Sequence, residues 1–162
     1  MKLYLKRYSL ESGCQFTIFD ENDNLKYKIV LENLLLGFSI YIIDSKNEEK
    51  SHIIQTDCLF AYLYIIKTNK QIIDMITNIN KDAKHIKFWG ADLAVDGDIL
   101  SKNFCLLSSD GKILMDHKVS NFYPQEYEIN IYDNAREELF ISIAICIDIL
   151  NSYPIQNPII VE

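Results

Sequence analysis

The densest basic cluster of the sequence lies in the middle of the chain. It consists of Lys81, Lys84, His85 and Lys87. The pattern over 84–89 is compatible with a β-strand, in which side chains alternate between two faces, so that His85 and Lys87 share a face with Trp89. Such a face could bind an anionic lipid headgroup. A solvated lysine cluster that protects a sheet edge is the simpler interpretation, and both stay open at this point.

Two acidic segments have the oxygen-rich composition of metal sites, but neither completes a motif. DENDNL (20–25) begins like a calcium-binding loop, yet Leu25 and Leu31 stand where such a loop needs glycine and glutamate. A hairpin turn with Asx hydrogen bonds explains this segment more simply. DLAVDGD (92–98) is explained by a tight turn at Asp96–Gly97. We therefore predict no metal site and no cofactor.

Residues suited to nucleophilic catalysis occur without a recognisable arrangement. The three histidines, His52, His85 and His117, fall in separate predicted strands and lack HxxxH or HExxH spacing. The sequence contains no GxSxG, GxxxxGK[ST] or GxGxxG motif, and its five glycines leave little for a phosphate-binding loop. We predict that the protein is not an enzyme, although a hydrolase built on a Cys–His pair stays open as an alternative.

The composition is that of an acidic globular protein with a net charge of −7 and a pI of about 4.9. Because an acidic protein is repelled by phosphate backbones, we expect no nucleic-acid partner and only weak binding to anionic lipid. The four cysteines, Cys14, Cys58, Cys105 and Cys146, form no CxxC pair. Reduced thiols and a cytoplasmic location are expected, since the start, MKLYLKRYSLESG, also lacks the apolar region of a signal peptide.

The most apolar stretch, LFISIAICIDILNSY at 139–153, is too short to span a membrane. Its uncharged part, Leu139–Ile147, has 9 residues, whereas a spanning helix needs about 20, so we do not expect an integral membrane protein. A capping box with Asn134 as N-cap and Glu137 at the third helical position predicts a helix over about 135–151. Apolar residues cover nearly its whole circumference, and such a helix must be buried on all sides.

The chain before this helix consists of short β-prone segments separated by turn residues. They pair as hairpins over 15–19 and 25–30, 37–43 and 51–55, 59–66 and 71–76, and 103–108 and 112–119, with a last strand over 127–132. Segment 71–76 also suits a helix, but the recurrence of turn residues at Asp20, Asp44 and Thr68 favours a strand. The economical solution is a mainly β fold in one domain over 1–162: a closed antiparallel barrel filled by the C-terminal helix.

Four segments carry a resemblance to a known family. They are VDGDI (95–99), FCLLSSDGKIL (104–114), YEINIYD (127–133) and EELFISIAICID (137–148). In this order they resemble the LURP-one-related (YxjI-like) family of the tubby C-terminal-like superfamily. The resemblance implies a barrel of about twelve strands around a central hydrophobic helix. Where such proteins often have a Lys-Lys-Trp-like stretch, this chain has His117–Lys118–Val119, and no binding residue is carried over.

The predicted function is a non-enzymatic binding or scaffold module whose partner is an unknown protein or a lipid headgroup. A lipocalin-like carrier of a small apolar ligand is the alternative, but the helix would occupy its lumen. Asp148 lies on the same helical stripe as Ile141 and Ala144, in the last turn, where burial and the helix dipole both disfavour an anion. We predict that it accepts hydrogen bonds from backbone, hydroxyl or basic groups as a structural latch. The functional alternative is a catalytic acid.

Overall fold

Twelve β-strands and one α-helix make up the part of the chain that the computed structural model describes, which is residues 1–7, 14–58, 60–78, 85–121 and 126–152. The strands are β1 (Lys2–Arg7), β2 (Cys14–Asp20), β3 (Leu25–Leu34), β4 (Gly37–Asp44), β5 (Glu49–Cys58), β6 (Ala61–Thr68), β7 (Ile72–Asn78), β8 (Lys87–Trp89), β9 (Leu93–Asp98), β10 (Asn103–Ser108), β11 (Ile113–Val119) and β12 (Glu126–Ile131). A short 3₁₀ helix, η3 (Asn134–Arg136), leads into α1 (Glu137–Ser152). Within these ranges, no helix has the length and apolar character needed to cross a membrane.

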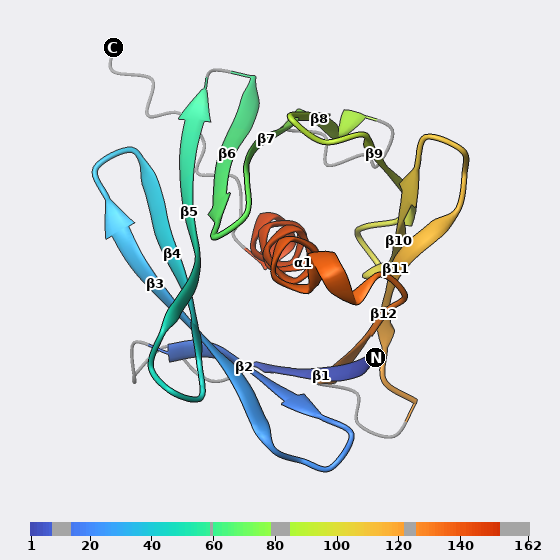
Figure 1. Ribbon diagram of the computed structural model, residues 1–162. Helices are drawn as coiled ribbons and strands as arrows, with labels where there is room; N and C mark the ends of the chain where they lie inside the picture. Colours follow the sequence, from blue (N-terminus) through green and yellow to red (C-terminus); the bar gives the residue numbers. More distant parts are fainter. Residues whose placement is uncertain (8–13, 59, 79–84, 122–125, 153–162) are drawn as a thin grey trace.

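The strands form one antiparallel sheet that curls into a barrel around α1 (Figure 1). Their order is β8-β7-β6-β5-β4-β3-β2-β1-β12-β11-β10-β9, so β1 joins the two halves of the chain. The predicted antiparallel barrel around the helix is confirmed, with one seam at which no ladder joins β8 to β9 among the described residues. With three residues, β8 offers few main-chain groups, and it pairs with β7 alone. The barrel is therefore nearly closed.

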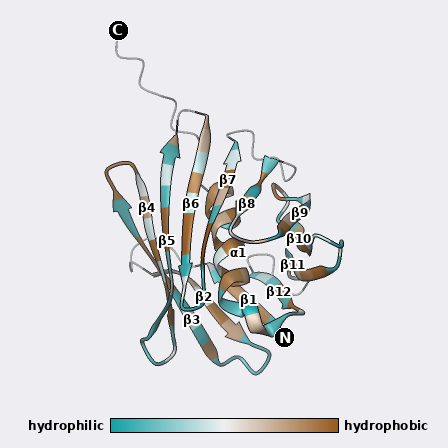
Figure 2. Cartoon of the chain, turned by 45° about the horizontal axis from the view of Figure 1, so that its top comes forward, coloured by the Kyte–Doolittle hydropathy of each residue, from teal (hydrophilic) through white to brown (hydrophobic). Residues whose placement is uncertain are grey.

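Burial alternates along the strands with the period expected of a barrel wall. In β7, Ile73, Met75 and Thr77 are buried, while the residues between them face outward. This alternation confirms the strand that was predicted over 71–76. Figure 2 shows the same mixture of hydrophilic and hydrophobic positions along the strands, whereas α1 is coloured mainly as hydrophobic.

The predicted Asx chemistry of the hairpin turns is confirmed. Asp20 Oδ1 accepts hydrogen bonds from the N–H groups of Asn22 (2.8 Å) and Asn24 (2.9 Å). Asp44 Oδ1 does the same one hairpin later, from Lys46 (2.9 Å) and Glu48 (2.9 Å). These acids shape turns in the chain, and this explains the D-x-N-x-N spacing without a metal.

The turn predicted at Asp96–Gly97 is wrong, because both residues lie inside β9. Gly97 has φ +108°, and a Cβ there would lie 2.6 Å from the backbone oxygen of Asn103. Glycine is needed at this position for the close approach of β9 and β10. The turn itself begins at Asp98, whose side chain accepts from the N–H of Leu100 (3.0 Å).

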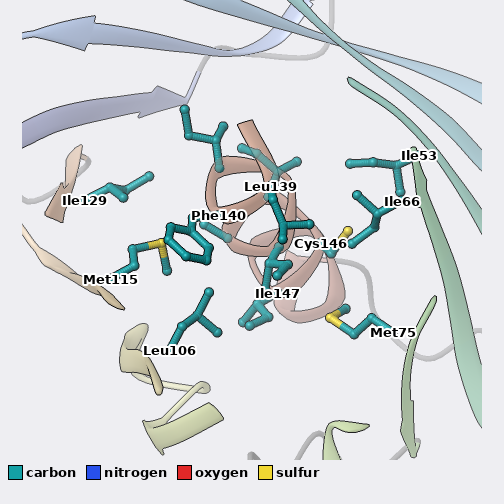
Figure 3. Packing of buried hydrophobic residues seen from close by; sticks show 14 of the residues in the cluster. Ile53, Ile66, Met75, Leu106, Met115, Ile129, Leu139, Phe140, Cys146 and Ile147 are labelled. Atoms are coloured by element: carbon teal, nitrogen blue, oxygen red, sulfur yellow. The ribbon is translucent and has the colours of Figure 1, made fainter. Parts of the chain in front are cut away.

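The helix α1 fills the lumen and is buried on every side. Every residue from Leu139 to Leu150 is buried, in agreement with the predicted all-round burial. Figure 3 shows wall side chains converging on the helix from both sides, with Ile53 and Ile66 on one and Leu106 and Met115 on the other. A lumen filled in this way leaves no room for the ligand of a lipocalin-like carrier.

The start of the helix differs from the predicted capping box. Asp133, and not Asn134, is the cap: its Oδ1 accepts from the N–H of Ala135 (3.2 Å). The reason is the 3₁₀ turn, which contains Asn134 and moves the cap back by one residue. Glu137 turns to the barrel wall, where its Oε1 accepts from Lys26 Nζ and the Tyr27 hydroxyl, both at 3.0 Å.

Candidate functional site

The end of the barrel at which α1 ends, called the C-terminal mouth below, carries exposed apolar turns. Strands β3, β5 and β9 all finish at this mouth because neighbouring strands are antiparallel. The residues that follow them are Leu35 and Leu36 after β3, Phe60 after β5 and Leu100 after β9, and all four are exposed. Leu35 is 98% exposed, the value of a side chain that touches almost nothing. Large leucines held in water at a barrel end are typical of a binding surface.

A groove of about 610 Å³ opens at this mouth between the β3–β4 hairpin and the helix end. Residues 33–38 form its outer wall, and β5 and β6 contribute Gln55, Asp57, Tyr62 and Tyr64. The last turn of α1 completes the lining with Ile149 and Leu150. Its volume lies within the range of about 300–1,000 Å³ that is usual for ligand pockets.

One polar atom in this groove lacks a partner. Gln55 is 3% exposed, and its Nε2 donates to Asp57 Oδ1. Its Oε1 is buried and accepts no hydrogen bond within the described part of the chain. A buried acceptor without a donor is unfavourable by about 1–3 kcal/mol.

The remaining polar groups of the groove favour a neutral or cationic ligand. Burial raises the pKa of the Tyr64 hydroxyl well above its ordinary value, and burial with the nearby Asp57 raises that of Tyr62. Both phenols are therefore neutral hydrogen-bonding groups at physiological pH. Among the described residues that line the groove, Asp57 is the one charged side chain. An anionic ligand would meet no cation here.

On the other side of the helix end, Asp148 is fully buried within a cluster of charged and aromatic groups. Lys102 Nζ lies 3.0 Å from Asp148 Oδ1, and His117 Nε2 lies 3.8 Å from Oδ2. The Lys102 ammonium also lies 4.5 Å from the centre of the Tyr127 ring. Because a carbonyl oxygen can only accept, His117 Nδ1 donates to the Lys102 carbonyl at 2.7 Å. His117 therefore fixes the backbone of the residue whose side chain pairs with Asp148.

This cluster keeps Asp148 ionised. Burial by itself would raise the pKa of the carboxyl, but His117 and Lys102 more than offset burial, and the pKa lies below its ordinary value. A carboxylate that is ionised, paired and closed off from solvent cannot exchange protons with a substrate. The geometry agrees with the predicted basic partner and not with a catalytic acid in an open mouth.

Of the predicted basic cluster, His85 and Lys87 lie within the described residues and Lys81 and Lys84 lie outside them. The strand predicted over 84–89 is shorter than expected, since β8 begins at Lys87. The alternation holds nevertheless: His85, Lys87 and Trp89 are exposed, and Ile86 between them is buried.

Burial reduces the reactivity of two of the described cysteines. Cys58, Cys105 and Cys146 are free thiols. Burial raises the pKa of Cys146 well above its ordinary value, and burial with nearby acids raises that of Cys105. A raised pKa reduces the thiolate fraction on which nucleophilic attack depends. Across the described ranges, no group of three or more His, Cys, Asp or Glu residues is placed to hold a metal.

A nearly closed antiparallel barrel whose lumen is filled by a C-terminal helix is consistent with a tubby-like fold. A family model described as LURP-one-related matches residues 1–148, and the chain therefore belongs to the LURP-one-related family, as its four segments predicted. An X-ray structure of a protein from Arabidopsis thaliana has a similar fold, with a TM-score of 0.61 and 15% identity over 93% of this chain and 91% of that chain. No curated protein matches the sequence. Family and fold together suggest a non-enzymatic binding module.

Proposed function

We propose that this chain is a non-enzymatic binding module, one domain over 1–162 that acts in the cytoplasm. Its binding surface is the groove at the C-terminal mouth, and its partner is a short extended apolar segment of another protein. The observation that carries this proposal is the groove itself, which is lined by the exposed Leu35 and Leu36 and by the last turn of α1.

The chemistry of an extended peptide suits this groove. Its apolar side chains would cover Leu35 and Leu36, which line the groove and are exposed. With Asp57 as the charged group in the lining, a neutral or cationic segment is favoured over an anionic one. Nucleic acid is disfavoured for the same reason and by the net charge of −7.

Binding of the neutral apolar dye Nile red tests this surface. We expect its fluorescence to rise with wild-type protein and to rise much less with Leu36→Ser. Leu100→Ser is the matched control, since Leu100 is 65% exposed and Leu36 69% exposed, but Leu100 lies outside the groove. Equal dye binding by wild type and Leu36→Ser would refute the groove as the binding surface.

A second, weaker surface is the exposed face of His85, Lys87 and Trp89. Lys81 and Lys84, the other members of the basic cluster, precede these residues in the sequence. We propose that it contributes at most weak contacts to an anionic headgroup, because polybasic lipid sites usually have about four to eight clustered basic residues. Sedimentation with phosphatidylcholine vesicles, with and without phosphoinositide, at about 0.15 M salt tests it. Strong phosphoinositide-dependent binding that Lys87→Ala abolishes would make this surface the primary one.

We propose that two carboxylates, one buried and one partly buried, hold the helix in place and take no part in binding. Asp148 pairs with Lys102 near the C-terminal mouth, and Glu137 pairs with Lys26 and Tyr27 at the opposite end of α1. Fastening at both ends fixes the depth of the helix in the barrel. It thereby fixes the position of Ile149 and Leu150 in the groove lining.

A further inference from the structure

We infer that a second copy of this chain docks on the outer face of strands β5–β8, where Lys67 of each copy pairs with Asp74 of the other. These strands form the wall on one side of α1 (Figure 1), and the residues that carry the inference do not line the groove at the C-terminal mouth. The inference therefore stands independently of the proposed function.

Apolar side chains gather on this outer face. The ladder places Ile54 opposite Ile65, Ile65 opposite Asp74, and Asp74 opposite Trp89. These positions alternate with the buried positions of the same strands, so their side chains point outward. The exposed apolar members of the face are Ile54, Ile65, Ile72 and Trp89, and Leu63 and Ile76 beside them are half-buried. A contiguous apolar face on the outside of a barrel is typical of a protein interface.

Two charged residues lie on this face in an arrangement that is complementary to itself. On β6 and β7, Ile65 lies opposite Asp74, and Lys67 lies opposite Ile72. The four residues therefore form a rectangle, with the isoleucines on one diagonal and the opposite charges on the other. A two-fold axis along the isoleucine diagonal brings Lys67 of each copy against Asp74 of the other. The same axis brings each isoleucine against its own counterpart.

Neither charge is neutralised within the described part of the chain. Lys67 is exposed and Asp74 is half-buried, and no ion pair joins either of them to a described residue. Each can therefore pair with a group from outside. A second copy supplies both missing partners at the required positions, whereas an unrelated protein has no reason to repeat this diagonal. Charge complementarity thus selects the occupant of the face.

The axis also determines how the two walls cross. Strands lie about 4.8 Å apart and alternate residues of one strand about 6.8 Å apart, so the strands of the two copies cross at roughly 70°. Two convex barrel walls that cross in this way touch mainly around the central rectangle. We therefore expect a dimer that depends strongly on the two ion pairs. Because each copy has a net charge of −7, the long-range repulsion between copies must be screened by salt.

The test uses the full-length chain and two charge reversals. Sedimentation velocity over about 1–100 μM protein, in about 0.15 M salt, should show a monomer–dimer equilibrium with a dissociation constant in the micromolar range. Lys67→Asp and Asp74→Lys each place like charges in both contacts, and each should raise this constant about tenfold or more. An equimolar mixture of the two variants should form a dimer again, since every contact then joins an Asp to a Lys.

A matched pair of apolar substitutions tests the rest of the face. Ile72→Ser should weaken the dimer, because Ile72 is 59% exposed and lies on the two-fold axis. Ile113→Ser is the control, since Ile113 is 48% exposed but belongs to β11, on another part of the wall. Equal effects of the two substitutions would exclude the outer face of β5–β8 as the contact.

Three further outcomes would overturn the inference. The first is a wild-type protein that stays monomeric over the whole concentration range. The second is a dimer that both charge reversals leave intact, which would place the contact elsewhere. The third is a dimer lost in each variant and not recovered in the mixture, which would show that Lys67 and Asp74 do not pair between copies.

Discussion

The two sides of the C-terminal mouth differ in how they treat the end of the same helix. On the side of β9–β12, Asp148 is 0% exposed and lies 3.0 Å from Lys102. On the side of β3–β6, Ile149 and Leu150 line a groove of about 610 Å³. Consecutive helical residues point about 100° apart, so neighbouring residues reach different walls of the barrel.

One side of the mouth is structural, and the other is open to a ligand. On the charged side, Lys102 and His117 both lie against the carboxylate, and His117 also holds the Lys102 backbone. The apolar side keeps an acceptor on Gln55 without a donor and leaves Leu35 in water. The first side is closed around an ion pair, whereas the second side presents an open groove of the kind that binds ligands.

A charge at the centre of the helix should unfold the protein and so abolish both sides of the mouth. Ile145 is 0% exposed, and Ile145→Asp would bury a charge in the hydrophobic core. The cost is several kcal/mol, comparable with the whole free energy of unfolding of a domain. We expect a protein unfolded by circular dichroism at room temperature. Thermal melting like that of wild type would show that the helix is not central to the fold.

Removal of the Lys102 ammonium should strongly lower the free energy of unfolding. Lys102→Met takes away the cation nearest to a fully buried carboxylate, and breaking a buried pair in this way costs about 3–5 kcal/mol. Urea unfolding measures the loss. Lys118→Met is the control, because Lys118 is exposed and its ion pair with Glu128 spans 3.4 Å. Equal losses in the two variants would contradict the special place of Lys102.

Two replacements of Asp148 should measure how much its contact with Lys102 contributes to stability. Asp148→Asn keeps an acceptor for Lys102, whereas Asp148→Leu leaves a mostly buried ammonium without this partner. Since a lost partner of a buried donor costs about 1–3 kcal/mol, we expect Asn to be milder than Leu by an amount in this range. Urea unfolding of both variants decides. A milder effect of Leu would show that shape, and not polar pairing, holds the helix end.

The charged side should also weaken in acid. The pKa of Asp148 in the folded protein lies below that of an unfolded Asp, which is about 3.9. Stability from its charge is thus present above about pH 3.9 and is lost as the pH falls through the lower folded value. We expect the difference in unfolding free energy between wild type and Asp148→Asn to shrink from pH 5 to pH 3. A constant difference would contradict the lowered pKa.

The smallest effect on stability is expected on the apolar side. Leu35 is 98% exposed, so Leu35→Ser should change the free energy of unfolding by no more than about 0.5 kcal/mol. Nile red binding should nevertheless fall. If binding falls while stability is unchanged, the side chain contacts the ligand and does not contribute to folding. A large loss of stability would instead assign Leu35 to packing within the protein.

Predictions from local pattern proved accurate where consecutive residues carry the information. The alternation at Ile73, Met75 and Thr77 and the Asx turns at Asp20 and Asp44 were predictable, because both depend on neighbours in the chain. The predicted turn at Asp96–Gly97 failed for a reason outside the local sequence. The close approach of Asn103 from β10, and not a turn, requires that glycine.

The candidate site was predictable only in part. That Asp148 needs a basic or hydrogen-bonding partner follows from its place in an apolar helix, but no pattern identifies Lys102, which is 46 residues away. The groove was not predicted at all. The run Leu34–Leu36 was the available signal, since three leucines at a hairpin tip interrupt the expected polar turn.

The sequence by itself determined the strand rhythm, the helix that must be buried on all sides and the family of the chain. Each of these depends on residue types at fixed short spacings, which local geometry converts into alternating or encircling faces. Tertiary structure decided the unpaired seam between β8 and β9, the partners of Asp148 and Glu137, and the groove beside Ile149. These depend on segments far apart in the chain meeting around one helix, and such distances and gaps are set by packing and not by sequence spacing.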